Sequence, residues 1–265
     1  MSAIDELFAR TRAEGRAALV GYLPAGFPTT ASSIAAIEAM IEGGVDLVEV
    51  GLPYSDPVMD GPTIQAAADQ ALAAGFRSSE VFDVVRASVA AGAPTVVMTY
   101  WNLVDRKGVN NFAADLAAAG GSGLITPDLI PDEAQEWMSA SDQNELDRIF
   151  LVAPSSTDER LAMTAEASSG FVYATAVMGV TGQREQSSSL APELVARLRK
   201  VTDKPIGVGL GVSNGAQAHE VAEFADAVIV GSALVRCLLD APDESAGLEA
   251  IRSLARELRA GVERS

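Results

Sequence analysis

The chain has 265 residues, 48% of them hydrophobic, and a formal net charge of −17. This length and hydrophobic content are typical of a globular protein with a sizeable core rather than of a disordered chain. The acidic balance argues against nucleic acid or an anionic membrane surface as a partner, because both attract basic surfaces.

The cysteine content and the N-terminal sequence indicate a compartment. Cys237 is the one cysteine, so no disulfide can form within the chain, and we expect it to be buried in a reducing cytosol. The first residues lack a basic segment followed by an apolar one, and no apolar run reaches membrane-spanning length. The sequence therefore predicts a cytoplasmic protein without a membrane segment.

Short apolar, β-branched runs alternate with helical patterns along the whole chain. The runs begin near Ala18, Val45, Thr95, Gly123, Ile149, Gly170, Pro205 and Ala227. Helical patterns between them cover residues 30–42, 79–91, 109–119 and 192–200. Because the runs are nearly continuous in apolar residues, they indicate a parallel sheet that is covered on both faces.

Strand–helix units repeated about eight times in this length predict a (β/α)₈ TIM barrel over residues 1–265, as a single domain. An open doubly wound sheet is the competing fold, and the lack of a composition break or linker disfavours it. Extra helices are expected at 61–74, before the second barrel helix, and at 2–13 and 244–259, where we expect them to cap the barrel.

The second strand carries the most informative residues. Glu49 lies inside an apolar run, where burial of a carboxylate is costly and is rarely retained for stability alone. Asp60 follows in a loop rich in proline and glycine, so the pair has the composition of acid–base machinery. Taken alone, Asp60 could equally be a turn residue or the cap of the next helix.

Other polar residues and glycines are expected at the carboxyl ends of the strands, where a barrel builds its active site. Tyr22, Tyr100 and Tyr173 fall at such positions, although Tyr100 and Tyr173 could also be ordinary core aromatic residues. Glycine-rich turns after the last strands, 209–213 and 231–232, together with the loop 178–182, are typical of a phosphate cradle.

The strand ends lack two residue types, and their absence excludes two classes of reaction. A Schiff-base aldolase needs a lysine there, but Lys107, Lys200 and Lys204 fall elsewhere. The sole histidine, His219, lies in a helical pattern, so no histidine cluster could bind a metal. The sequence therefore predicts a reaction without a cofactor or metal in this chain, carried out by carboxyl groups.

Taken together, these motifs resemble the tryptophan synthase alpha chain family over nearly the whole chain. The longest and most specific motif is EVGLPYSDPVMDGPTIQ at 49–65. Shorter ones are PAGFP at 24–28, MTYWN at 98–102, PD at 127–128, MGVTG at 178–182, GLGVS at 209–213 and GS at 231–232.

The resemblance implies a lyase that cleaves indole-3-glycerol phosphate into indole and glyceraldehyde 3-phosphate. It assigns the general acid–base role to Glu49 and the second catalytic carboxylate to Asp60, with Tyr173 beside them. Tyr22 and Tyr100 are expected to border the substrate as well. The phosphate-binding positions that it implies are Gly182, Gly211, Gly231 and Ser232.

The resemblance also implies a partner, a beta chain that holds pyridoxal phosphate and receives indole in an α₂β₂ heterotetramer. Apolar residues near Pro53 and Val58 would suit that interface. Two alternatives remain open. One is a stand-alone indole-releasing lyase; the other is a catalytically silent barrel that activates a beta chain, which Glu49 and Asp60 argue against.

Overall fold

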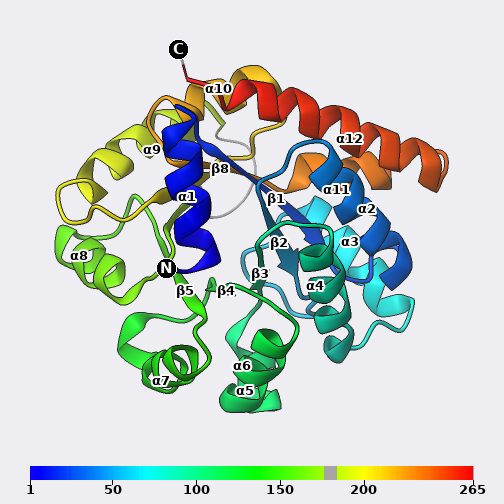
Figure 1. Ribbon diagram of the computed structural model, residues 1–265, viewed down its shortest axis with the longest axis horizontal. Coiled ribbons are helices and arrows are strands. Elements are labelled where there is room, and N and C mark those ends of the chain that lie inside the picture. The colour runs from blue at the N-terminus through cyan, green and yellow to red at the C-terminus, as the bar shows by residue number, and fades with distance from the viewer. Residues whose placement is uncertain (176–183, 265) are drawn as a thin grey trace.

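The computed structural model describes residues 1–175 and 184–264, and its strands form a closed parallel barrel (Figure 1). Each strand pairs with the next along the chain, and β8 pairs with β1. The strands are β1 (Ala18–Pro24), β2 (Leu47–Gly51), β3 (Thr95–Met98), β4 (Gly123–Thr126), β5 (Asp147–Val152), β6 (Val172–Thr175), β7 (Ile206–Gly209) and β8 (Ala227–Val230). The predicted barrel is confirmed, and the open sheet is excluded.

Helices alternate with the strands and, apart from α1, form the outer wall. They are α1 (Ala3–Ala13), α2 (Thr30–Glu42), α3 (Pro62–Ala73), η1 (Ser78–Glu80), α4 (Val81–Ala90), α5 (Trp101–Lys107), α6 (Val109–Ala118), η2 (Pro131–Glu133), α7 (Gln135–Gln143), α8 (Asp158–Ala167), α9 (Arg184–Leu198), α10 (Gly215–Ala222), α11 (Ser232–Leu239) and α12 (Glu244–Gly261). The extra helix after β2 is confirmed as α3. Helix α9 begins eight positions before Pro192, which lies inside it although the sequence suggested a helix start there.

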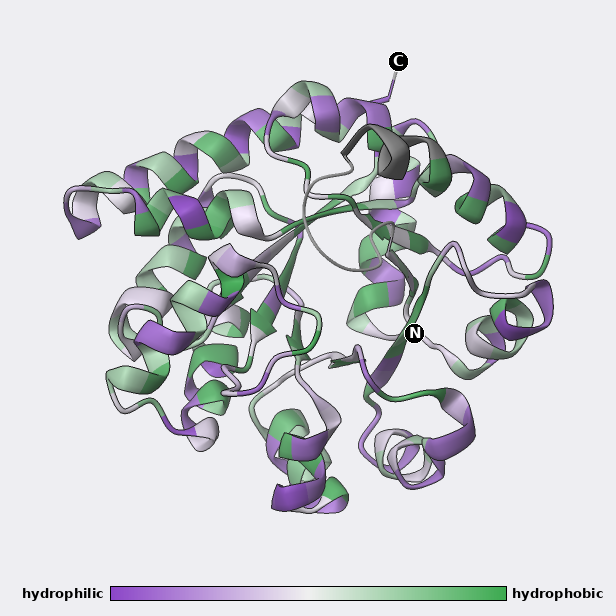
Figure 2. Cartoon of the chain, turned by 180° about the vertical axis from the view of Figure 1, so that it is seen from behind, coloured by the Kyte–Doolittle hydropathy of each residue, from purple (hydrophilic) through white to green (hydrophobic). Residues whose placement is uncertain are grey.

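Alternation along each strand separates two apolar layers. Outward residues such as Val48 and Val50 pack under the helices, whereas inward residues such as Leu47 fill the barrel. The outer helices carry hydrophilic residues at intervals, as the purple segments in Figure 2 show. A sheet with both faces covered in this way explains why its strands read as continuous apolar runs.

Helix α1 closes the end of the barrel where the strands begin (Figure 1). Its capping box joins Ser2 and Asp5, and its apolar side chains Ile4, Leu7 and Phe8 are buried in the same cluster as the inward strand residues. The rings of Phe8 and Phe171 are 5.8 Å apart. The prediction that the first helix caps the barrel is confirmed.

Helix α12 does not cap the barrel, which corrects the sequence-based expectation. It packs along α2, α10 and α11 on the outer wall, where it runs as the red helix of Figure 1. Its buried residues Gly247, Ile251, Ala255 and Leu258 recur every three or four positions. Such a single narrow stripe fits the groove between neighbouring helices better than it covers a barrel end.

Buried side chains also hold the strands together at the end of the barrel that α1 closes. The buried Arg16 makes two hydrogen bonds to Asp46, of 2.6 and 2.8 Å, and Asp46 also accepts the backbone N–H of Leu19 in β1. Likewise Asp226 accepts the N–H of Ile206 in β7 at 2.8 Å. Each carboxylate thus provides an acceptor for a buried backbone N–H group of a strand.

Candidate active site

Glu49 lies in the middle of β2 and points into the barrel. Its neighbours Val48 and Val50 belong to the outer core, so strand alternation places the Glu49 side chain on the inner face. The residue is 1% exposed, and no described group hydrogen-bonds its Oε2 atom. Burial, reinforced by the charge of Asp60, raises the pKa of Glu49 from 4.5 to about 8.

Asp60 lies in the loop that leaves β2, within electrostatic reach of Glu49. It does not cap α3: Gly61 is the N-cap residue there, and that cap makes no side-chain hydrogen bond. Asp60 Oδ1 instead accepts the Tyr100 hydroxyl at 3.0 Å. Burial raises the pKa of Asp60, and the bond from Tyr100 acts in the opposite direction.

Tyr22 and Tyr173 border the two carboxyl groups inside the barrel. Tyr22 stands opposite Glu49 in the register of β1 and β2, and Tyr173 stands opposite Gly207 in β6 and β7. Burial raises the pKa of both phenols, and the charge of Glu49 raises each further. Since that charge acts on both, the tyrosines and Glu49 share one low-dielectric site.

Two glycines make room for these tyrosines. A Cβ at Gly51 would lie 2.2 Å from the Tyr22 hydroxyl oxygen, and one at Gly209 would lie 2.6 Å from that of Tyr173. Any larger side chain at either position would displace a phenol from the site. The glycine-rich strand ends therefore serve the tyrosines as well as the turns.

The predicted phosphate-binding positions lie partly within the described chain. Gly211 follows β7 with φ +69° and has open space where a side chain would project. Gly231 follows β8 and is the N-cap residue of α11, which begins at Ser232. Because parallel strands end at the same side, these residues face the same mouth as Glu49. Gly182 lies outside the described residues.

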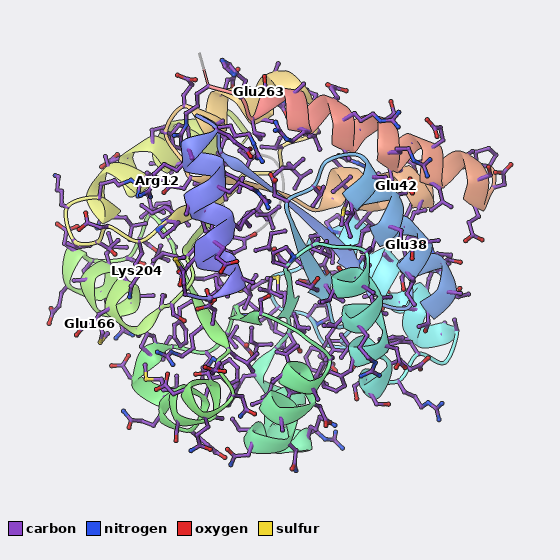
Figure 3. All side chains as sticks on the ribbon, viewed as in Figure 1. Arg12, Glu38, Glu42, Glu166, Lys204 and Glu263 are labelled. Atoms are coloured by element: carbon purple, nitrogen blue, oxygen red, sulfur yellow. The ribbon has the colours of Figure 1, made fainter. Side chains whose placement is uncertain are left out.

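The remaining chemistry-bearing residues stand away from this mouth. Lys204 precedes β7 and donates to the carbonyl oxygens of Ala165, at 2.7 Å, and Glu166, at 3.0 Å; Figure 3 shows it beside Glu166. His219 lies on the surface of α10. Cys237 is half-buried rather than buried. Residues 1–175 and 184–264 hold no group of three potential metal ligands.

Several contacts of the Asp60 loop could not be foreseen. Tyr100 also accepts the backbone N–H of Met59 at 3.0 Å, Gln65 donates to the Asp60 carbonyl oxygen at 2.7 Å, and Asn102 donates to the Tyr54 hydroxyl at 3.0 Å. The pairs with Tyr100 and Asn102 span more than forty positions, and no sequence spacing signals them.

The family model for the tryptophan synthase alpha chain matches residues 8–263. The tryptophan synthase alpha chain of Salinispora arenicola is 65% identical over 262 residues, covering 99% of this chain and 98% of that one. A solved structure of Mycobacterium tuberculosis tryptophan synthase superposes with a TM-score of 0.93 at 58% identity, over 99% and 98% of the two chains.

A more distant solved structure has the same fold. It is a tryptophan synthase complex from Pyrococcus furiosus, with a TM-score of 0.83 at 32% identity, over 92% of this chain and 98% of that one. The match of the family model to almost the whole chain agrees with the barrel and with the two carboxyl groups at its mouth. The chain belongs to the tryptophan synthase alpha chain family.

Proposed function

We propose that this chain cleaves indole-3-glycerol phosphate to indole and glyceraldehyde 3-phosphate, as the alpha subunit of a tryptophan synthase. The observation that carries the proposal is the burial of Glu49 beside Asp60 at the barrel mouth, which raises the pKa of Glu49 to about 8. A carboxyl group that keeps its proton near neutral pH is an effective general acid, and Asp60 can complement it as a base.

The first step makes indole carbon C3 able to leave. Glu49 donates its proton to C3 while Asp60 accepts the proton from ring nitrogen N1, so the ring becomes a neutral indolenine. Both carboxyl groups are needed at once, because protonation of C3 alone would leave a positive charge on the ring. Burial of the site strengthens each of these interactions.

The second step breaks the carbon–carbon bond. Glu49, now a carboxylate, accepts the proton of the hydroxyl on the glycerol carbon that is bonded to C3. This glycerol carbon becomes the aldehyde carbon of glyceraldehyde 3-phosphate. The bonding electrons return to the ring, and N1 recovers its proton from Asp60. Both carboxyl groups then regain their starting states, so this chain would need no cofactor of its own.

Binding of the substrate is proposed at the residues that line the mouth. Tyr22, Tyr100 and Tyr173 would border the indole ring, since aromatic faces pack well against a flat aromatic ligand. The phosphate would lie against Gly211, Gly231, Ser232 and Gly182. Support comes from the open space at Gly211 and from the start of α11 at Ser232, where free N–H groups favour an anion.

We also propose that the chain works in an α₂β₂ heterotetramer with a beta chain that holds pyridoxal phosphate. The Pyrococcus furiosus relative is described as part of a complex. Val58 and Met59, 79% and 45% exposed, extend from the Asp60 loop and would suit such a contact. No helix among the described residues is long and apolar enough to cross a membrane. The cytoplasmic location and the single domain over 1–265 stay predictions.

Indole release tests this proposal directly. The wild type and Glu49→Gln are assayed with indole-3-glycerol phosphate, with and without a tryptophan synthase beta chain. We expect weak activity alone, strong activation by the partner, and a loss of about 10³-fold in the variant. Full activity without the partner would favour a stand-alone lyase, and no cleavage under either condition would leave only an activating barrel.

A further inference from the structure

The Tyr100 hydroxyl has two partners in one loop. It donates to Asp60 Oδ1 at 3.0 Å and accepts the N–H of Met59 at 3.0 Å. Tyr100 itself comes from the end of β3, is 5% exposed and is the N-cap residue of α5. One rigid, buried phenol therefore joins the side chain of Asp60 to the backbone of the residue before it.

Two further sets of contacts hold Tyr100 and the start of α5 in place. The carboxylate of Asp128 accepts the Trp101 N–H at 2.9 Å, which holds the first turn of α5. The ring of Tyr54 packs on that of Tyr100 with centroids 5.3 Å apart, and the Tyr54 hydroxyl accepts a hydrogen bond from Asn102 at 3.0 Å. The loop is thus held at Tyr54 and again at Met59, and the segment between them is mostly exposed.

We propose that Tyr100 is a positioning residue that holds the Asp60 carboxylate in place and links its orientation to the exposed Val58–Met59 segment. This inference rests on the proposed function and gives Tyr100 a role beyond bordering the substrate. A carboxylate on a loop of this kind can rotate freely about two bonds unless a partner fixes one oxygen. With Oδ1 held by Tyr100, Oδ2 is left to accept the proton of N1.

The direction of the bond also matters. Tyr100 donates, and a donated hydrogen bond stabilises the anionic form of Asp60 against the burial that disfavours it. Without that donor, more of the enzyme would hold Asp60 protonated, which is the wrong state for a base. Tyr100 therefore supports both the orientation and the charge that the first step requires.

The test is Tyr100→Phe, which removes the hydroxyl and keeps the ring that packs on Tyr54. We expect kcat to fall at least about tenfold, while KM changes less than about twofold. The acid limb of the pH profile should move to higher pH, because Asp60 loses its donor. A rise in KM with an unchanged kcat and pH profile would indicate simple substrate contact and would overturn the proposal.

Tyr54→Phe is the matched control. It removes a hydroxyl from the same aromatic pair and the same loop, but the lost bond goes to Asn102 and leaves Asp60 untouched. The acid limb should therefore stay at its wild-type position in this variant. If both variants shift the acid limb of the pH profile equally, general loosening of the loop explains the shift. The proposal of a specific role for the Tyr100 hydroxyl would then be wrong.

A measurement without turnover separates this inference from the proposed function. In chains labelled with ¹³C-carboxyl aspartate, the signal missing from Asp60→Asn identifies Asp60. Its pKa should be higher in Tyr100→Phe than in the wild type, and an equal pKa would overturn the inference. If Asp60→Asn instead retains full indole release, the proposed base itself fails, whatever Tyr100 does.

Discussion

A glutamate whose side chain is almost fully buried must gain something that offsets the cost of its burial. In Glu49 the cost appears as a pKa near 8, because the apolar barrel disfavours the charged form. That same shift supplies a carboxylic acid that still holds its proton at neutral pH. The destabilising feature and the proposed chemical function are therefore one property of this residue.

The two carboxyl groups predict a bell-shaped dependence of kcat/KM on pH. Glu49 must begin protonated, so activity should fall on the alkaline side with a midpoint near pH 8. Asp60 must begin ionised, so activity should fall on the acid side, above the ordinary range of an aspartate. Initial rates of indole release at low substrate concentration measure both limbs. A rate that keeps rising beyond pH 9 would contradict the acid role of Glu49.

Glu49→Gln should also change stability with pH. The folded chain keeps the Glu49 proton up to about pH 8, whereas the ordinary pKa is 4.5, so the folded state loses stability as pH rises between these values. We expect the variant to raise the free energy of unfolding by roughly 4 kcal/mol at about pH 8.5 and to change it little at about pH 5. Urea unfolding at both pH values measures this. An equal rise in the free energy of unfolding at both pH values would indicate improved packing rather than loss of a buried charge.

At the scale of elements, the two ends of the barrel have different tasks. The end where strands begin is closed by α1 and fastened by carboxylates that accept strand N–H groups, as Asp46 does for Leu19. The opposite end carries long loops whose side chains meet at Glu49 and Asp60. Substitutions at the first end should therefore affect stability, and those at the second should affect chemistry.

Asp46→Ala tests this division. The side chains of Arg16 and Asp46 are 5% and 7% exposed, and loss of one partner leaves a buried guanidinium with fewer acceptors. We expect the free energy of unfolding to fall by about 3 kcal/mol, with KM for indole-3-glycerol phosphate unchanged. Urea unfolding gives the stability, and Asp83→Ala, at an exposed pair with Arg86, should cost less than about 0.5 kcal/mol. Equal losses in the two variants would refute the argument.

Helix positions show how far local sequence patterns extend. The range 30–42 agrees with α2 at both ends, because Thr29 caps the first turn and Gly43 follows the last. The prediction that α12 caps the barrel was wrong. Its stripe of apolar residues predicts that the helix packs against another surface, but does not identify that surface. Local periodicity determines which face is buried, whereas the surface that receives the face depends on the whole fold.

At the scale of the whole molecule, we expect the exposed residues of the Asp60 loop to contact the beta chain. Val58→Asp places a charge at a side chain that is 79% exposed, so it should barely affect folding. At a desolvated interface the same charge is costly. We therefore expect the ratio of partner-stimulated to basal indole release to fall at least about tenfold at limiting beta chain. Ile130→Asp places a charge at a side chain that is 42% exposed in the loop after β4, and it tests whether the interface extends to that loop. An unchanged ratio for Val58→Asp would place the contact elsewhere.

The sequence by itself determined the barrel, the family and the pair of carboxyl groups. Strand alternation and motif composition are local properties, and Glu49 is conspicuous within an apolar run of any fold. Only the tertiary structure decided that Asp60 bonds to Tyr100 rather than capping α3, and that Gly51 and Gly209 make room for two phenols. These contacts join residues distant along the chain. Barrel closure brings them together, and no local spacing encodes which side chains then meet.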